Sequence, residues 1–168
     1  MCLSVAVRPR LVDHSIRGPY VLLTAVQYSR RVTTRETAQR FSDEIRALLG
    51  QVDEVHIEPR SAEGQRVGPV TVWVVVVDNN VYVRSYRGPS GRWYQALLRH
   101  PTGVLHADGR DVPFRAVPVE DQAEIARVSE AYRRKYEQNW PKETAEMLHD
   151  EVLPTTLRLE PEAASGSR

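Results

Sequence analysis

The segment from Asn79 to Ala107 contains the side chains best suited to binding an anion. It has no Asp or Glu, and its basic and imidazole side chains are Arg84, Arg87, Arg92, Arg99, His100 and His106. The whole chain of 168 residues has a net charge of only +1, so any positive field is local. We expect a phosphate or a carboxylate to bind here. The alternative is that these arginines only keep an exposed hairpin soluble.

The loop Arg87–Gly91 (RGPSG) stands at the centre of this segment, directly before a predicted helix over about 91–99. Its glycines allow the backbone to approach a ligand closely, and Ser90 offers a hydroxyl donor. The free N–H groups at a helix N-terminus also favour an anion. These features place the predicted anion site between the end of a strand and the start of a helix.

Several aromatic residues lie near this loop in the sequence: Trp73, Tyr82, Tyr86, Trp93 and Tyr94. Flat aromatic side chains beside cations can stack on a heteroaromatic ring while the cations hold its phosphates. The alternative is that they are core residues. Trp73 lies in a run of valines and would then be buried, and Trp93 would anchor its helix.

Other kinds of site have little support in the sequence. The five histidines show no metal-ligand spacing, so we predict no metal site. Cys2 is the only cysteine, which rules out an internal disulfide and suits a reducing compartment, so we expect a cytoplasmic protein. The longest apolar run, Val70–Val77, is too short to span a membrane, and the isoelectric point of about 7.9 argues against nucleic-acid binding.

Residues 1–33 give no clear pattern, and we treat them as a poorly defined extension. Thr33 and Glu36 have the spacing of a capping box, which predicts a helix over about 34–49 that Gly50 ends. The apolar face of this helix would contain Phe41, Ile45, Leu48 and Leu49.

After this helix the apolar period changes from helical to alternating, which predicts strands. The predicted strands are Val55–Ile57, Val70–Val77, Val81–Tyr86, Gly103–Ala107, Arg110–Val119 and Thr155–Leu159. Asp78–Asn80 and Asp108–Gly109 are typical hairpin turns, because Asp, Asn and Gly tolerate positive φ angles. Pro59–Gly68 reads as a loop.

Further helices are predicted over about 121–137, where Asp121 and Glu124 have capping-box spacing, and from Pro141 to about Asp150. Residues 161–168 form a small polar tail that we expect to be disordered. The whole pattern predicts an α+β fold, in which about six antiparallel strands form a closed or half-closed barrel flanked by helices. This domain would span 34–160.

Several stretches resemble an uncharacterised bacterial family within the flavin- and deazaflavin-binding split β-barrel superfamily, which includes the deazaflavin-dependent nitroreductases. The matching stretches are DEVHIEPR (53–60), VTVWVVVVDNNVYVRSYRGPSGRWY (70–94), DVPFRAV (111–117), AYRRKY (131–136) and TTLRL (155–159). The resemblance implies an antiparallel split β-barrel and a homodimer. It also implies that the strand end and the loop after the hairpin contact a cofactor phosphate. Carried over to this chain, the cofactor-binding residues are Arg84, Ser85, Arg87, Gly88 and Arg92, with Trp93 or Tyr86 flanking the ring.

Three functions remain open from the sequence. The first is an oxidoreductase-like protein that binds FMN or a deazaflavin coenzyme, with Tyr82, Tyr86 and His106 as candidate proton donors by their proximity in sequence. The second is a cofactor-free barrel that binds an anionic small molecule, as a lyase, isomerase or cyclase. The third is a dimeric binding module without catalysis.

Overall fold

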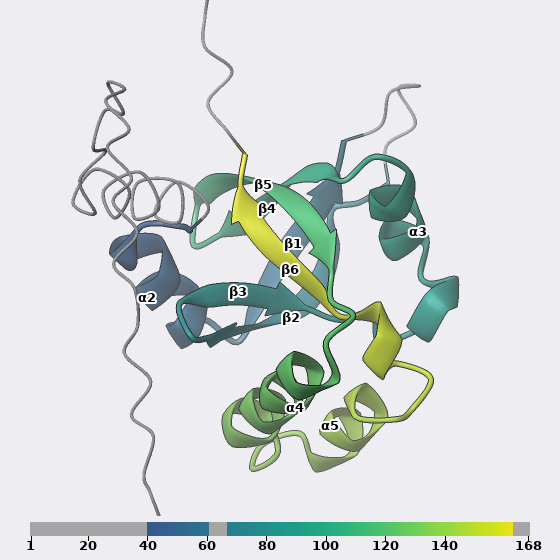
Figure 1. Cartoon of the computed structure of the whole chain (residues 1–168). Helices are drawn as coiled ribbons and strands as arrows, with labels where there is room; N and C mark the ends of the chain where they lie inside the picture. Colours follow the sequence, from purple (N-terminus) through teal and green to yellow (C-terminus); the bar gives the residue numbers. More distant parts are fainter. Residues whose placement is uncertain (1–39, 61–66, 163–168) are drawn as a thin grey trace, which may run out of the picture.

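The computed structural model describes residues 40–60 and 67–162. Six antiparallel strands form a closed barrel in the order β1-β2-β3-β6-β5-β4 (Figure 1). The strands are β1 Glu54–Pro59, β2 Val70–Val77, β3 Asn80–Val83, β4 Thr102–Ala107, β5 Arg110–Pro118 and β6 Leu157–Pro161. The α+β fold and the antiparallel barrel predicted from the sequence are therefore confirmed.

Two tight hairpins set the register of the barrel. Asp78 and Asn79 have φ angles of 50° and 65° and join β2 to β3. Asp108 and Gly109, with φ angles of 46° and 72°, join β4 to β5. Positive φ at both central residues gives a turn whose twist matches that of the strands, so both predicted hairpins are confirmed.

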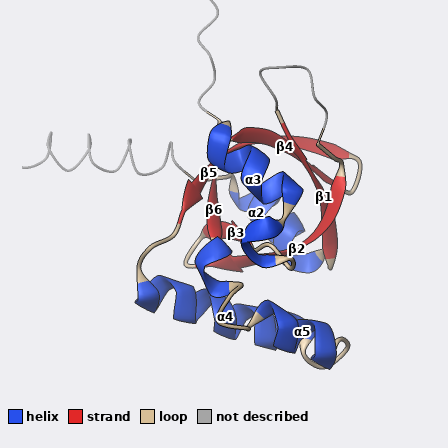
Figure 2. Cartoon of the chain, turned by 90° about the vertical axis from the view of Figure 1, so that its right-hand side faces the viewer, coloured by secondary structure: helices blue, strands red, loops and turns tan. Residues whose placement is uncertain are grey.

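Alternating side chains fill the barrel interior. Val72 and Val74 from β2 and Leu157 and Leu159 from β6 belong to one buried cluster. Figure 2 looks along the barrel and shows α3 (Arg92–Arg99) over the near opening and α2 (Asp43–Gln51) behind it. Leu49 from α2 and residues of α3 join the same cluster, so each helix closes one end.

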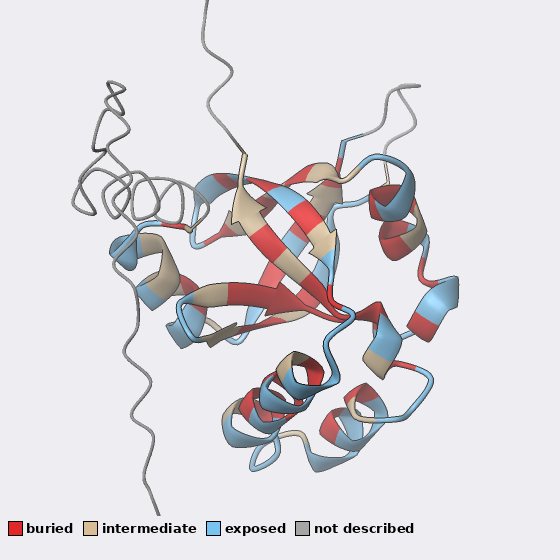
Figure 3. Cartoon of the chain, viewed as in Figure 1, coloured by how far each residue is buried: buried red, intermediate tan, exposed pale blue. Residues whose placement is uncertain are grey.

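The helices α4 (Gln122–Tyr136) and α5 (Pro141–Met147) form a second layer outside β2 and β3 (Figure 1). A separate buried cluster fills the space between this layer and the barrel, and it includes Val75, Tyr82, Val128 and Tyr132. The outer faces of both helices are exposed (Figure 3). The central valines of β2 are thus buried on both faces of the sheet, Val72 and Val74 inside the barrel and Val75 under α4.

Polar contacts fix the end of α4 against the barrel. The Tyr136 hydroxyl shares its single proton between the carbonyls of Asp53 and Val74, at 2.7 and 2.9 Å, and accepts from the Val74 N–H at 3.1 Å. Lys135 Nζ donates to the carbonyls of Leu49 and Val74, at 3.1 and 2.8 Å. Burial of this amine lowers the pKa of Lys135 to about 8. Lys135 and Tyr136 of the AYRRKY stretch therefore join α4 to β2 and α2.

Several predicted boundaries are wrong. The helix predicted to begin at 34 begins at Asp43, because Ser42 caps it by accepting a hydrogen bond from the Ile45 N–H at 3.4 Å. Gly50 lies inside α2 and does not end it. The residues Thr33 and Glu36, and the extension over 1–33, lie outside the described residues.

The later boundaries also shift. The strand predicted to run to Tyr86 ends at Val83, the last residue of β3 that pairs with β6, and the Ser85 N–H donates instead to Thr155 Oγ1 at 3.1 Å. The helix from Pro141 ends at Met147 rather than near 150, and a 3₁₀ turn, η2 (Leu153–Thr155), replaces the predicted start of β6. Pro161 belongs to β6 and not to the tail. The helix predicted over 121–137 is confirmed within one residue at each end.

Candidate functional site

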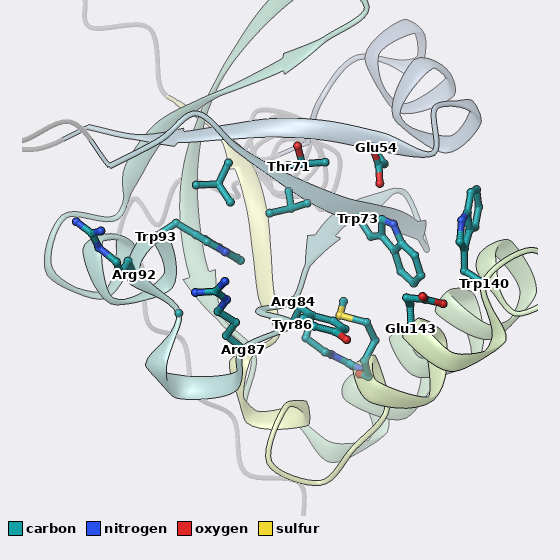
Figure 4. Close-up of a pocket in the computed structure, with 14 residues that line it drawn as sticks. Glu54, Thr71, Trp73, Arg84, Tyr86, Arg87, Arg92, Trp93, Trp140 and Glu143 are labelled. Carbon is teal, nitrogen blue, oxygen red and sulfur yellow. The ribbon is translucent and has the colours of Figure 1, made fainter.

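A cavity of about 620 Å³ lies where the barrel, the loop after β3, α3 and α5 meet (Figure 4). This volume is in the range of small-molecule and cofactor pockets. Its wall is formed by Glu54, Val70, Thr71, Val72, Trp73, Arg84, Tyr86, Arg87, Gly91, Arg92, Trp93, Trp140, Glu143 and Met147. Residues from five separate elements or loops therefore converge on one space.

The loop after β3 is held by its own backbone. The Gly88 N–H donates to the Ser85 carbonyl at 2.8 Å, and Gly88 has a φ angle of 57° that suits glycine. The short 3₁₀ turn η1 (Gly88–Ser90) follows, and the Ser90 hydroxyl donates to the Arg87 carbonyl at 2.8 Å. Gly91 packs so closely that a Cβ there would lie 2.2 Å from Ser85 Oγ. This loop is therefore fixed, with Tyr86 and Arg87 at its exposed turn.

Arg84 is the first residue of this loop, directly after β3, and it is only 1% exposed. Its Nε donates to Thr156 Oγ1 at 2.9 Å, and one terminal nitrogen donates to the Met147 carbonyl at 2.9 Å. The other terminal nitrogen donates to Ser129 Oγ at 3.2 Å and, more weakly, to the Ile125 carbonyl at 3.5 Å. Every one of these acceptors is uncharged.

The positive charge of Arg84 is therefore buried beside the cavity wall. Burial lowers the pKa of Arg84, but a guanidinium stays protonated in proteins. The Arg84 guanidinium carbon lies 5.2 Å from the centre of the Tyr132 ring. This cation–π contact stabilises the buried charge, which has lost its contact with water. Within the described residues no carboxylate pairs with this guanidinium. Its main contacts join β3 to α4, α5 and η2.

Arg87 and Arg92 have the opposite surroundings. Both are exposed, and both line the cavity. Among residues 40–60 and 67–162 neither side chain makes a hydrogen bond or an ion pair. Their N–H groups are therefore available to an external acceptor, and a guanidinium fork matches a phosphate or carboxylate in geometry.

Aromatic residues supply much of the remaining wall. Trp93 is only 6% exposed and packs edge-to-face on Tyr94, whereas Tyr86 is 54% exposed at the mouth. Trp73 is stacked on Tyr136, with the ring centres 4.1 Å apart and the planes within 5°. Trp140 is tilted by 51° to Trp73 at 5.8 Å. The cavity can therefore contact the faces and edges of a flat ring.

The structure brings together some of the residues predicted from the sequence. Arg84, Arg87, Arg92, Trp93 and Tyr86 all line the cavity. Ser85 and Gly88 do not line it; they shape the loop that carries Arg87. Ser85 is completely buried, and its hydroxyl oxygen has no hydrogen-bond partner among the described residues.

Tyr82 and His106, two of the three candidate proton donors, lie elsewhere. The Tyr82 hydroxyl donates to Glu124 at 2.8 Å under α4, where burial and then this carboxylate raise the pKa of Tyr82. His106 lies on the outer face of β4, 2.7 Å from Asp111 and 3.1 Å from Glu58. Proximity in sequence did not place them at the site: Tyr82 packs in the buried cluster under α4, and His106 lies on β4, which contributes no residue to the cavity wall.

Half of the cavity wall consists of residues that no sequence pattern had singled out. Glu54 at the start of β1 and the residues of α5 were not singled out, and Trp73 was weighed mainly as a core residue. Trp73 does pack on the second cluster, yet it is only partly buried and also faces the cavity. The signal that could have found Trp140 is its position directly before Pro141, at the cap of α5.

Comparison with known proteins places the chain in a family. Residues 45–159 match the family described as "Uncharacterized protein conserved in bacteria (DUF2255)". The chain belongs to this family. No curated protein matches it.

Two solved structures share the fold of this DUF2255 protein. The conserved hypothetical protein Rv2991 from Mycobacterium tuberculosis is 19% identical, with a TM-score of 0.53 over 76% of this chain and 83% of its own. HutZ, the heme storage protein from Vibrio cholerae, is 14% identical, with a TM-score of 0.51 over 73% of this chain and 91% of its own. At these identities the likeness concerns the fold alone.

The described ranges lack two further kinds of feature. Residues 40–60 and 67–162 contain no cluster of His, Cys, Asp and Glu that could hold a metal ion. No helix in the same ranges has the length and apolar character needed to cross a bilayer.

Proposed function

We propose that this DUF2255 protein binds a flat aromatic coenzyme with an anionic tail, either FMN or a deazaflavin coenzyme, and that it acts as an oxidoreductase. The observation that carries the proposal is that two guanidinium groups, those of Arg87 and Arg92, have no partner among the described residues and lie beside Trp93 at one end of the cavity (Figure 4). The buried charge of Arg84 adds to the positive potential at the wall.

The chemistry of the side chains fits such a coenzyme. Two guanidinium forks can hold a phosphate by several N–H···O contacts, and the aromatic rings can flank a planar ring system. When bound, the coenzyme would supply hydride chemistry. The chain would bind and orient it and exclude water from one of its faces. Among the three candidate proton donors only Tyr86 lines the cavity, so we assign that role to its hydroxyl.

The cofactor-free alternative uses the same residues. Arg87 and Arg92 would hold the carboxylate or phosphate of a substrate, and Tyr86 would act as general acid or base in a lyase, isomerase or cyclase.

HutZ, which shares the fold, is a heme storage protein. Haem iron is bound by His, Cys, Met or Tyr, and of these types the described wall offers only Met147 and Tyr86. Haemin therefore belongs in the test.

We also propose a homodimer. Val70 and Tyr86 are exposed at the cavity, at 36% and 54%, and Leu98 on the neighbouring α3 is 46% exposed. A second copy over this face would cover these side chains and narrow the cavity mouth. Sedimentation velocity at micromolar protein concentration tests this, and a purely monomeric species would contradict it.

The direct test of coenzyme binding is a titration of the purified protein with FMN, a deazaflavin coenzyme, haemin and inorganic phosphate. We expect one of the two flavin-type coenzymes to bind in the micromolar range or tighter, followed by absorbance and fluorescence. In Arg87→Glu/Arg92→Glu, reversing two charges at a phosphate should weaken binding by a hundredfold or more, on the order of 1.5–3 kcal/mol for each hydrogen bond to a charged group.

The matched control is Arg99→Glu/Arg115→Glu, which changes the net charge equally at two exposed arginines outside the wall. It should bind the coenzyme as the wild type does. If phosphate alone binds, the cofactor-free alternative is favoured. Unchanged coenzyme affinity in Arg87→Glu/Arg92→Glu would refute the assigned site.

A further inference from the structure

We propose that the other end of the cavity binds the positively charged group of a small organic molecule, such as an amine or a quaternary ammonium. This acidic end consists of Glu54, Trp73, Trp140 and Glu143 (Figure 4). The proposal concerns a different ligand group from the one assigned to Arg87 and Arg92 and does not depend on the identity of the coenzyme.

Tertiary structure brings two carboxylates to this end from distant parts of the chain. Glu54 begins β1 and lies opposite Trp73 in the register of β1 and β2. Glu143 lies in the first turn of α5, three residues after Trp140. Within the described residues neither carboxylate makes a hydrogen bond or an ion pair. Both are therefore free to pair with a cation from solution.

The tryptophans at this end are held in place. One face of Trp73 is covered by Tyr136, and Trp140 leans on both rings at 5.8 and 6.0 Å. The parts of Trp73 and Trp140 that line the cavity therefore present fixed, electron-rich indole surfaces. Aromatic faces close to carboxylates are the surroundings in which proteins bind organic cations.

The charges of the wall are segregated. Arg87 and Arg92 come from the loop after β3 and from α3, whereas Glu54 and Glu143 come from β1 and α5, and the two pairs lie at opposite ends (Figure 4). Free carboxylates would weaken a cavity that held only an anion, because like charges repel. The separation suits a cavity that orients one end of its contents as an anion and the other as a cation.

Choline and its uncharged isostere 3,3-dimethyl-1-butanol test the charge preference directly, since they differ mainly in one positive charge. We expect choline to bind the wild type about fivefold or more tightly than the isostere at low salt, measured by NMR titration. In Glu54→Gln/Glu143→Gln the two affinities should become equal. In Trp140→Leu choline should lose more affinity than the isostere.

The matched control is Glu137→Gln/Glu146→Gln, which removes two exposed carboxylates outside the wall and should leave choline binding unchanged. Equal binding of choline and the isostere by the wild type would overturn the proposal, and so would an unchanged preference in Glu54→Gln/Glu143→Gln. Choline binding retained in Arg87→Glu/Arg92→Glu would show that this end acts independently, even if no coenzyme binds at the other.

Discussion

Arg84 and Arg87 are only three positions apart in the sequence but lie in opposite surroundings. Arg84 is buried and donates to Thr156, Ser129 and main-chain carbonyls of the helical layer. Arg87 is exposed at the cavity and, within the described residues, has no acceptor. One residue type therefore serves two purposes here. The buried guanidinium of Arg84 holds the layers together, and the exposed guanidinium of Arg87 is available to bind a ligand.

The largest expected effect comes from removing the buried member of the pair. Arg84→Ala leaves the Met147 carbonyl and its other buried acceptors without a donor and creates a cavity, so the free energy of unfolding should fall by about 3 kcal/mol or more. Urea denaturation measures this loss. Arg87→Ala is the control and should change stability by less than about 0.5 kcal/mol. Equal stabilities of the two variants would break the comparison.

Gly91, at the start of α3, packs directly on Ser85, the residue after Arg84. A Cβ at position 91 would lie 2.2 Å from Ser85 Oγ. We expect Gly91→Ala to cost on the order of 1–2 kcal/mol, since a buried region resists added volume. Ser85→Ala should restore most of this loss, because the Ser85 hydroxyl has no hydrogen-bond partner among the described residues and its removal leaves Cβ at 3.4 Å. A double-mutant cycle by urea denaturation measures the coupling, and purely additive effects would contradict the contact.

His106 differs from both arginines, because its partners are two carboxylates near the surface, those of Asp111 and Glu58. The hydrogen bond to Asp111, and secondarily that to Glu58, raises the pKa of His106 above 6.5. A raised pKa contributes stability that is complete below the unfolded-state value of about 6.5 and is lost as pH rises through the folded-state value.

Because His106 is about one-third exposed, this contribution should be below about 1 kcal/mol. His106→Gln should therefore reduce the fall in unfolding free energy between pH 6 and pH 8, measured against Asp108→Asn as an exposed control. An identical pH dependence in wild type and His106→Gln would refute the ion pairs.

Local sequence patterns predicted most elements of the barrel. The alternation of Val81–Val83, the Asp-Gly turn at 108–109 and the cap at Asp121 each depend on neighbours within a few residues, and the structure contains all three features. The boundary predictions that failed lie at Gly50, which α2 includes, and at Tyr86, which lies beyond the end of β3. At the end of β3 a distant segment changes the backbone pairing, because the Ser85 N–H donates to Thr155 Oγ1 and the ladder with β6 ends at Val83.

The candidate site also has one half that a local sequence pattern reveals and one half that it does not. Its basic half is contiguous in the chain, so an acid-free segment could reveal Arg87, Arg92 and Trp93. Its acidic half unites Glu54 with Trp140 and Glu143, which come from β1 and the start of α5. No local pattern relates residues so far apart, because their proximity arises only when α4 packs on β2.

By itself the sequence determined the strand pairing through hairpins, the antiparallel barrel and the presence of a cationic loop, since periodicity, turn chemistry and charge are local properties. Only the tertiary structure decided that Arg84 is buried while Arg87 is exposed at the cavity, and that two carboxylates and two tryptophans complete the cavity wall. Burial and partner choice depend on what a side chain meets after the layers pack, and the chain does not encode that in any single segment.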